Sequence, residues 1–397
     1  MIIDLLPKEL IVLLKDIQCS GFSFCLVGGF PRDYFLAKKM SHDLDFEIRP
    51  ALDRPPISPS EWDQYYERLL NLLESKKIKY KRLPYLITRI EFGEFNLEFT
   101  SPRIEINRDN EHGHHHFTAV LNPNLTYEES FKRRDFTINA IGIELDMVQN
   151  REFIIDPYGG REDLLNGLLK NISQDFFFDS VRFLRLIRFQ LKFKKFIMQE
   201  SLADQIGNFN LSKLSLHHFT EELLKSNPGE FLNLFVKLIK EHNLVIPKTF
   251  AFWSDMYFPD DLQTKDDILA YVLIAYNLDY AQKVAVFFSL PNKKLRDLKS
   301  FIQSFESIIK LTKKEVANFL KLPLNEALSS PILKELKNLE EKKEYKSFFK
   351  LSYEDLIISW ADWEKVKVEF SEIEQLKVSD RSYYLFYKAL KLKFQHE

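Results

Sequence analysis

The chain has very little cysteine, with Cys19 and Cys25 the only two among its 397 residues. Two cysteines cannot build a disulfide framework, and their spacing is not that of a metal site. Cys25 lies in an apolar segment that predicts a buried strand. The sequence therefore excludes a disulfide-stapled secreted domain and favours a reducing, cytoplasmic compartment.

Long apolar runs and excess charge of one sign are missing as well. No stretch reaches the 18 or more apolar residues of a membrane span. The N-terminus has an early acid and a proline, Asp4 and Pro7, instead of the basic and apolar regions of a signal peptide. The net charge is -2, so any nucleic-acid site must be a local basic patch. We expect no membrane partner and, at this length, several domains.

Apolar patterning divides the chain into two parts. Short strands alternate with helical patterns up to about residue 150, and strand signals nearly vanish past about 160. The predicted strands are Phe24–Val27, Leu44–Ile48, Tyr85–Ile90 and Phe95–Phe99. The predicted helices include Asp179–Lys192, Phe219–Leu224, Phe231–Ile239 and Ile268–Tyr276. We therefore predict an α+β fold, with a mixed-sheet head at 1–150 followed by an elongated all-helical neck at 151–210, body at 211–300 and tail at 301–397.

The most informative stretch begins where an apolar strand runs into Gly28 and Gly29. Arg32 follows at once, and two aspartates one residue apart, Asp43 and Asp45, come shortly after. Residues at this spacing on a strand share a face, so both carboxylates would point the same way beside a backbone turn able to approach phosphates. Paired carboxylates suit Mg²⁺, and two such ions can clamp the attacking and leaving oxygens of a phosphoryl or nucleotidyl transfer.

A third carboxylate is expected near this pair, because an attacking hydroxyl must lose its proton close to a metal. Glu98 is the best candidate, since strand alternation buries Leu97 and Phe99 and turns Glu98 to the opposite face. That face could be the one that holds the aspartates. An exposed strand glutamate explains the pattern equally well.

A polar turn at 132–140 offers nucleotide contacts. Its guanidinium groups, Arg133 and Arg134, suit phosphates, and Asp135 or Asn139 suits ribose hydroxyls. Residues 156–160, Asp-Pro-Tyr-Gly-Gly, form a turn signal that closes the head.

A polar stripe recurs every three residues farther along, at Asp179, Arg182, Arg185 and Arg188. On an α-helix this spacing makes one slowly drifting face, with Val181, Leu184, Ile187 and Phe189 expected to pack on the other side. Planar hydrogen-bonding side chains in a row suit reading a base edge and holding a triphosphate.

Taken in order, these motifs resemble those of the bacterial-type, class II tRNA nucleotidyltransferases, the CCA-adding enzymes, whose head is shared with bacterial poly(A) polymerases. The resemblance covers roughly residues 24 to 190. It implies that Asp43 and Asp45 hold catalytic Mg²⁺, with Glu98 as the third carboxylate. It implies nucleotide contacts from Gly28, Gly29, Arg32 and the turn of Arg133, Arg134, Asp135 and Asn139.

The resemblance further implies an amino-acid template at Asp179 and Arg182, continued by Arg185 and Arg188. Cytosine and adenine both present an exocyclic amine beside a ring-nitrogen acceptor, which a carboxylate and a guanidinium match. The chain departs from the family at Phe178, where a glutamate is usual, and at 217–225, His-His-Phe-Thr-Glu-Glu-Leu-Leu-Lys. It also carries four histidines within 112–116, which we interpret as a polar substrate-touching loop in preference to a metal site.

The expected reaction is addition of C and A to tRNA 3′ ends from CTP and ATP, with release of pyrophosphate. Alternatives are a CC-adding or A-adding enzyme, a poly(A) polymerase, and a non-catalytic RNA-binding relative. A modest basic cluster could contact tRNA phosphates, although a solvated helix face explains it equally well; it consists of Lys310, Lys313, Lys314 and Lys321. The sequence leaves the oligomeric state open.

Overall fold

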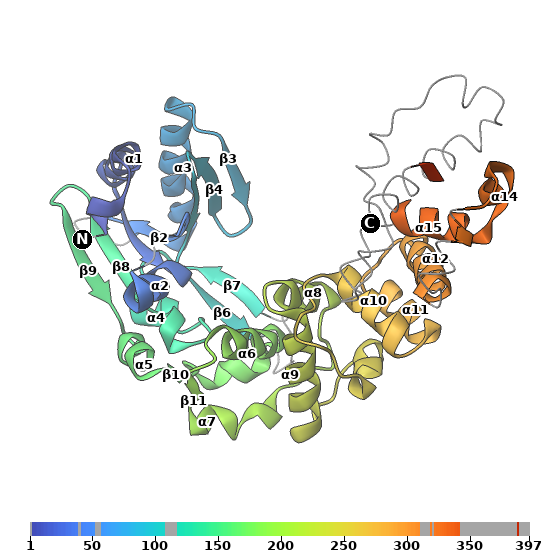
Figure 1. The fold of residues 1–397 in the computed structure, drawn as a ribbon. Helices are drawn as coiled ribbons and strands as arrows, with labels where there is room; N and C mark the ends of the chain where they lie inside the picture. The colour runs from blue at the N-terminus through green and yellow to red at the C-terminus, as the bar shows by residue number, and fades with distance from the viewer. Residues whose placement is uncertain are drawn as a thin grey trace. The chain divides into compact units, whose positions relative to one another are not determined.

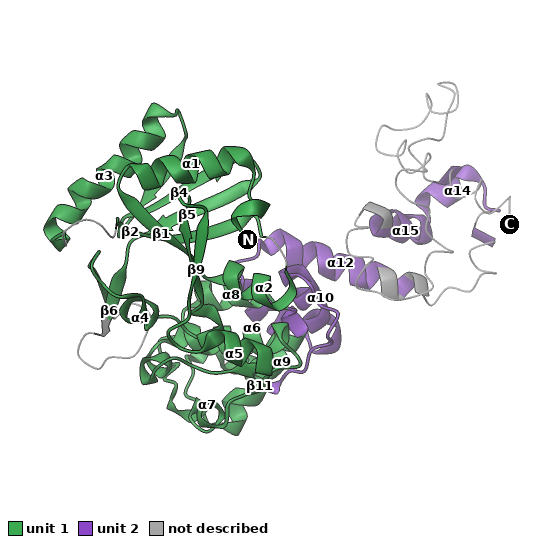
Figure 2. Cartoon of the chain, turned by 90° about the vertical axis from the view of Figure 1, so that its left-hand side faces the viewer, with its two compact units in different colours: residues 1–226, 230–254 green, residues 227–229, 255–397 purple. Residues whose placement is uncertain are grey.

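The computed structural model describes residues 2–38, 41–51, 57–107, 117–309, 318–319, 321–341 and 387–388. The chain forms two compact units (Figure 2). Unit 1 comprises residues 1–226 and 230–254, and unit 2 comprises residues 227–229 and 255–397. The finer division of the chain at 150, 210 and 300 stays a prediction.

Unit 1 begins with a seven-stranded mixed sheet in the order β3-β4-β5-β2-β1-β8-β9 (Figure 1). Within it, β2 and β5 are parallel and the other neighbours are antiparallel. The strands are β1 (Phe22–Val27), β2 (Asp43–Pro50), β3 (Tyr80–Leu83), β4 (Ile87–Phe92), β5 (Phe95–Thr100), β8 (Gly142–Asp146) and β9 (Arg151–Ile155).

Two helices, α1 (Lys8–Cys19) and α3 (Pro59–Ser75), bury one apolar face each in the core of this sheet. α3 begins sharply because Ser58 and Glu61 form a reciprocal capping box and Pro59 follows the cap. On β2 the alternate residues Leu44, Phe46 and Ile48 belong to the same core cluster. The intervening residues of β2 therefore face the other side of the sheet, away from this core.

Three of the four predicted strands lie within β1, β2 and β5, but the prediction of Tyr85–Ile90 was wrong at its start. Tyr85 and Leu86 have φ angles of 62° and 51°, so they belong to a turn. The hairpin pairs Leu83 with Ile87, which leaves three residues to make the connection. Left-handed backbone suits such a tight connection, and the apolar pattern alone could not reveal it.

Short elements lie between the strands of this sheet and after its last strand. They are α2 (Gly29–Ala37), α4 (Tyr127–Phe131), the 3₁₀ turn η3 (Thr137–Asn139) and α5 (Gly160–Asn166), with the hairpin β6 (Arg103–Asn107) and β7 (Phe117–Leu121). The predicted turn at Asp156–Gly160 caps α5, since the Asp156 carboxylate accepts hydrogen bonds from the backbone of Gly160 and Arg161 at 2.7 and 3.0 Å. A Cβ at Gly160 would lie 2.1 Å from the Thr137 carbonyl oxygen, so only glycine lets α5 pack this closely on η3.

The described part of the chain past residue 160 is mainly helical, as predicted, apart from two-residue strands at β10 (Leu168–Leu169) and β11 (Ile197–Met198). Unit 1 continues with α6 (Ser180–Lys192), α7 (Glu200–Ala203), α8 (Leu216–Leu224) and most of α9 (Pro228–Glu241). Phenylalanine supplies much of the packing here. Phe209 contacts the rings of Phe176, Phe177 and Phe183 at centroid distances of 5.1–5.5 Å.

Unit 2 contains α10 (Lys265–Ala275), α11 (Leu278–Phe287), α12 (Asn292–Ile309), α14 (Leu324–Ser329) and α15 (Pro331–Glu341). α15 buries Leu333, Leu336 and Leu339. Of the predicted basic cluster, Lys321 is exposed, and Lys310, Lys313 and Lys314 lie outside the described residues. Across the described helices, none combines the length and the apolar character that crossing a membrane requires.

Candidate active site

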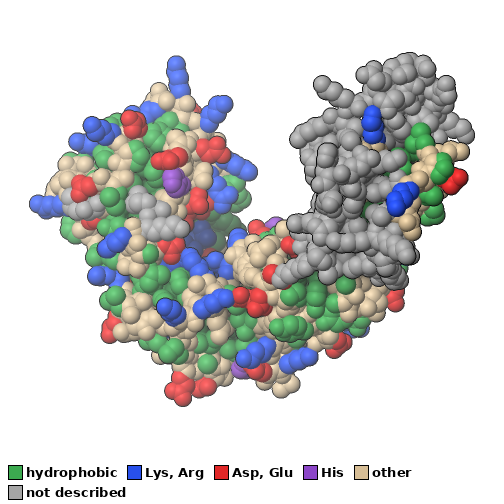
Figure 3. Space-filling view, in the orientation of Figure 1, with side chains coloured by type: hydrophobic (Ala, Val, Ile, Leu, Met, Phe, Trp, Pro, Cys, Tyr) green, Lys and Arg blue, Asp and Glu red, His purple; other side chains and the backbone are tan. Residues whose placement is uncertain are grey.

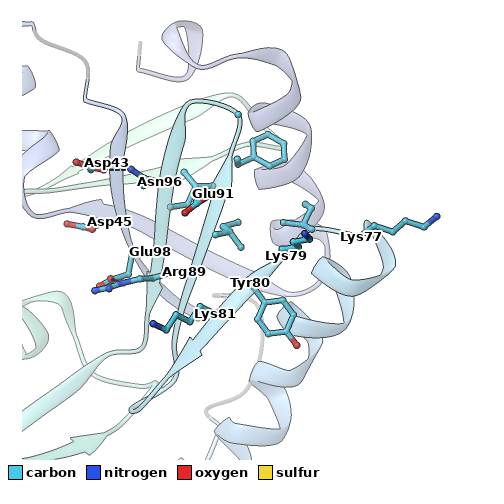
Figure 4. A pocket seen from close by; sticks show the side chains of 15 residues that line it. Asp43, Asp45, Lys77, Lys79, Tyr80, Lys81, Arg89, Glu91, Asn96 and Glu98 are labelled. Carbon is cyan, nitrogen blue, oxygen red and sulfur yellow. Dashed lines mark hydrogen bonds and ion pairs between the residues drawn. The ribbon is translucent and has the colours of Figure 1, made fainter. Parts of the chain in front are cut away.

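Two aspartates stand together on the face of β2 that points away from the core. The register pairs Asp43 with Asn96 and Asp45 with Glu98 on the parallel strand β5. The Asn96 side chain donates to the Asp43 carboxylate at 2.8 Å. The expectation that Asp43 and Asp45 share a face with Glu98 beside them is therefore confirmed (Figure 4).

Asp45 is held against the turn that precedes α2. Gly28 has a φ angle of 80°, and a Cβ at that position would lie 2.8 Å from Asp45 Oδ2. The backbone approaches the carboxylate this closely only because residue 28 is glycine. Burial and the nearby Glu98 carboxylate raise the pKa of Asp45 to about 6, although the positive charge of Arg134 opposes them. Negative charge is thus concentrated at this point.

Glu98 has a partner that the sequence did not predict. Arg89 on β4 lies opposite Glu98 in the sheet, and its guanidinium donates to Glu98 Oε2 at 2.5 Å. The antiparallel register of two strands creates this pair. The alternation of residues within each strand does not predict this pair, because the pair depends on how β4 and β5 are aligned.

All eleven residues predicted to contact a nucleotide line one cavity of about 470 Å³. This nucleotide cavity, as we name it, also contains Asp45, Glu105, Val181 and Phe189. A second cavity of about 900 Å³ contains Asp43, Asp45 and Glu98. Asp45 borders both, so the carboxylates stand where two cavities meet. Charged side chains of both signs line the hollow of unit 1 in Figure 3.

The predicted nucleotide residues are Gly28, Gly29, Arg32, Arg133, Arg134, Asp135, Asn139, Asp179, Arg182, Arg185 and Arg188. They come from α2, from the turn before η3 and from α6.

A chain of hydrogen bonds joins these three elements. Arg32 Nη1 donates to Asn139 Oδ1 at 2.5 Å, and Asn139 Nδ2 donates to Asp135 Oδ1 at 2.8 Å. Arg185 Nε on α6 donates to Asp135 Oδ2 at 2.6 Å. Asp135 is therefore the centre of the network. It holds Arg185 directly and Arg32 through Asn139, and it also lines the cavity.

Arg32 is fixed from several sides. Its guanidinium makes a two-pronged bond to Asp33 at 2.7 and 2.9 Å, and Lys192 on α6 lies 3.3 Å from the same carboxylate. The Cζ atom of Arg32 also lies over the Phe189 ring, 5.2 Å from its centroid. Three interactions at once hold this planar group in one orientation, which suits recognition of a phosphate. No sequence motif pointed to Lys192 as a partner of Asp33.

Asp179 is the N-cap of α6, where it accepts a hydrogen bond from Val181 N at 2.9 Å. The cap fixes the carboxylate at the cavity edge, 3.9 Å from Arg182 Nε. Arg182 in turn donates to the Arg133 carbonyl oxygen at 2.7 Å. Asp179 and Arg182 are thus both buried and both anchored through the backbone.

The opposite face of α6 agrees with the prediction except at Val181. Leu184, Ile187 and Phe189 are buried, as expected, and Phe189 packs on Phe136 and Phe193. Val181 is half-buried, and both it and Phe189 border the nucleotide cavity. The Cζ atoms of Arg188 and Arg185 lie 4.6 and 5.6 Å from the centroid of the Phe189 ring. An aromatic face attracts guanidinium groups, so this buried ring also supports the arginines of the polar stripe.

Glu222 on α8 is buried and accepts a hydrogen bond from Arg188 Nε. It lies in the segment 217–225, which departs from the family pattern. Because a buried carboxylate requires a charged partner, this pair fixes Arg188 at the cavity wall. Its helical neighbour Lys225 lies 3.4 Å from the other carboxylate oxygen.

Three arginines that line the cavity have a buried guanidinium N–H group without a hydrogen-bond partner. Among the described residues, Arg133 Nε, Arg134 Nε and Arg182 Nη1 are buried and form no hydrogen bond. Burial together with the neighbouring Arg103 and Arg134 lowers the pKa of Arg133 to about 9. Unsatisfied buried donors of like charge are costly, and an anion with several acceptor oxygens would satisfy them.

We expect Asp135 to make the free energy of unfolding depend on pH in the acid range. Burial raises the pKa of Asp135, but Arg185 and Asn139 together lower it to about 2. Because the folded pKa lies below that of the unfolded chain, Asp135 stabilises the fold above about pH 4, and that contribution of about 2 kcal/mol disappears as the pH falls toward about 2. Asp135→Asn should lower the urea unfolding midpoint at pH 7, and the difference from wild type should shrink in this acid range. A difference independent of pH would contradict the linkage.

The described residues do not include the histidine-rich segment 112–116, so its expected role stays a prediction. Phe178, at the position where the family usually has glutamate, ends the 3₁₀ turn η4 (Gln174–Phe178) and is half-buried.

Comparisons with known proteins agree with this geometry. The family model of the poly A polymerase head domain matches residues 24–170. A multifunctional CCA protein of Xylella fastidiosa is 34% identical over 167 residues, which cover 40% of this chain and 38% of that protein. A CCA-adding enzyme of Francisella tularensis is 30% identical over 209 residues, covering 48% of this chain and 55% of that enzyme. The matched stretches thus span less than two thirds of these relatives.

The fold extends the likeness over nearly the whole chain. The structure of the Bacillus stearothermophilus CCA-adding enzyme in complex with CTP matches with a TM-score of 0.52 and 18% identity. The match covers 98% of each chain.

Proposed function

Since the chain is a relative of the bacterial-type CCA-adding enzymes and carries a poly A polymerase head domain at residues 24–170, we propose that it adds C and A to tRNA 3′ ends. The substrates are CTP, ATP and a tRNA that lacks part or all of its CCA end. The tRNA 3′-hydroxyl oxygen forms a bond to the α-phosphorus, the bond between that phosphorus and the bridging oxygen breaks, and pyrophosphate leaves. The observation that carries the proposal is the position of Asp45, which borders both a carboxylate cavity and a guanidinium-lined cavity.

The carboxylates fit Mg²⁺. Asp43 and Asp45 offer hard oxygen donors on one face of β2, with Glu98 beside them. Mg²⁺ is usually held by one or two carboxylates and substrate phosphates, so an open pair suits it better than a closed cage. When bound there, Mg²⁺ would stabilise negative charge at the reacting phosphate. Glu98 would accept the proton that the attacking hydroxyl loses.

The arginines fit the triphosphate. Arg133 and Arg134 line the nucleotide cavity and each has a buried N–H group without a hydrogen-bond partner, and Arg32 is locked in one orientation by Asp33 and Asn139. These donors would hold the phosphates and stabilise the charge that develops on pyrophosphate. Their rigidity matters because an oriented donor loses little entropy when the nucleotide binds.

Selection of C and A would come from Asp179 and Arg182. Both bases present an amine donor next to a ring-nitrogen acceptor, whereas uracil and guanine present the reverse order at these positions. A fixed carboxylate can accept from the amine, and a fixed guanidinium can donate to the ring nitrogen. The N-cap bond of Asp179 and the bond from Arg182 to the Arg133 carbonyl support this role, since they hold both groups at the cavity edge.

One assay separates this function from its alternatives. Purified protein is offered tRNA transcripts that end at the discriminator base, at C or at CC, with labelled CTP or ATP and with oligo(A) as a control. We expect all three tRNAs to be extended to CCA. A product that stalls at CC, or extension of the CC-ended tRNA alone, would assign a CC-adding or an A-adding enzyme. Long A-tracts on oligo(A) would assign a poly(A) polymerase, and no extension at all would leave an RNA-binding relative.

A further inference from the structure

The hairpin of β3 and β4 forms the edge of the sheet beside the carboxylates, and its two faces differ. Tyr80 and Arg82 point to α3, where Tyr80 bonds to Glu74 at 2.8 Å and Arg82 bonds to Glu67 at 2.6 Å and to Asp63 at 2.8 Å. Strand alternation turns Lys81, which lies between them, to the opposite face. That face borders the cavity of about 900 Å³.

The cavity side of the hairpin keeps its lysines without acidic partners. Lys77, Lys79 and Lys81 all line the cavity and are exposed, and no described carboxylate lies within ion-pair distance of any of them. On the α3 side, by contrast, Arg82 is paired twice. The α3 side of the hairpin is thus neutralised, whereas the cavity side presents lysines whose charges are open to an anionic ligand.

The sheet register places these cations in line with the reacting centre. Lys81 lies opposite Arg89, Arg89 opposite Glu98, and Glu98 opposite Asp45. Neighbouring strands lie about 4.8 Å apart, so the row reads as two cations and then two carboxylates from the edge inward. Figure 4 shows Lys81, Arg89 and Glu98 along this row, with Asp45 beyond them.

We propose that this face is the binding surface for the acceptor strand of the RNA, with Lys79 and Lys81 contacting its backbone phosphates. The inference rests on the proposed function and adds a surface to it. An in-line displacement brings the attacking hydroxyl to the phosphorus from the side opposite the leaving group. The guanidinium-lined nucleotide cavity takes pyrophosphate on one side of Asp45, so the RNA approaches from the cavity on the other side.

The charge pattern fits a strand that ends at the carboxylates. Phosphates of the strand meet Lys79 and Lys81 at the edge, whereas its terminal hydroxyl, which carries no charge, reaches Glu98 and Asp45. Arg89 lies between the two groups and is more than half exposed, so it neutralises Glu98 and remains open to the strand. Glu91 is the other acid on this face; it lies opposite Asn96 in the row that leads to Asp43.

The test compares the double variant Lys79→Gln/Lys81→Gln with wild type and with Lys15→Gln. Lys15 is an exposed lysine on α1, which packs into the core on the other side of the sheet. Steady-state assays give KM for tRNA and for CTP, and a salt series gives the slope of log affinity for tRNA against log salt. We expect KM for tRNA to rise about tenfold and the slope to fall by about 1 for each lysine removed. KM for CTP and all values for Lys15→Gln should match wild type.

The possible outcomes separate the two proposals. A wild-type protein that extends tRNA, together with a double variant that keeps the wild-type KM for tRNA and the wild-type salt slope, would overturn the surface assignment alone. A double variant with a raised KM for CTP and an unchanged KM for tRNA would show that the lysines contact the nucleotide. That result would also overturn the surface assignment. A wild-type protein that extends none of the tRNAs would instead refute the function. The urea unfolding midpoint of each variant shows that the fold is intact.

Discussion

Asp45→Asn is expected to lower kcat for CTP and ATP addition by about 10³-fold or more, a loss of about 4 kcal/mol of transition-state stabilisation. The asparagine side chain has the size of aspartate and fits against Gly28, but its amide group carries no charge and is a poor ligand for Mg²⁺. Asp45 borders both cavities, so its loss affects the acceptor and the nucleotide together. Single-turnover extension of a CC-ended tRNA at saturating ATP measures the effect.

The fold should survive this substitution. Burial and Glu98 already disfavour the Asp45 charge, so its removal relieves repulsion, and the urea unfolding midpoint should stay equal or rise. Asp63→Asn is the matched control, because Asp63 is exposed on α3, where its partner is Arg82. It should keep wild-type kcat. Turnover of Asp45→Asn within tenfold of wild type would refute the metal assignment.

Asp179→Asn is expected to reduce discrimination between CTP and UTP by about 10- to 100-fold, measured as the ratio of their kcat/KM values. Asparagine is as good an N-cap as aspartate, so the bond from Val181 N and the start of α6 are kept. The atom that faces Arg182 changes from an acceptor to an amide donor, which no longer matches an exocyclic amine. Binding of the triphosphate should change little, because its arginines are untouched.

Two further variants sharpen this experiment. Arg182→Lys keeps the positive charge but loses the planar fork, so it should also weaken discrimination and should lose the bond to the Arg133 carbonyl. Glu162→Gln makes the same carboxylate-to-amide change at an exposed site in the first turn of α5 and should behave as wild type. If Asp179→Asn and Arg182→Lys both discriminate CTP from UTP as wild type does, base selection must lie elsewhere.

The carboxylates and arginines proposed to carry the reaction could be identified from the sequence. Asp43 and Asp45 could be placed on one face because strand alternation is a local property of the chain, whereas Glu98 joins them only through the pairing of β2 with β5. The arginine stripe of α6 likewise follows from helical periodicity, which needs no tertiary information. Each of these side chains lies in the site where the motif predicted it, although their roles stay proposals.

What the tertiary structure decided is which partners hold these groups and from which side each substrate can come. Arg89 meets Glu98, Lys192 meets Asp33 and Glu222 meets Arg188 across separations of 9, 159 and 34 residues. Such pairs depend on strand register and helix packing, and no local pattern encodes them. The same holds for the contact of Arg32 with the buried ring of Phe189, which brings together α2 and α6. The sequence by itself thus determined the reactive groups, whereas only the packing of distant segments set Asp45 between two cavities, because a boundary between cavities belongs to no single stretch of chain.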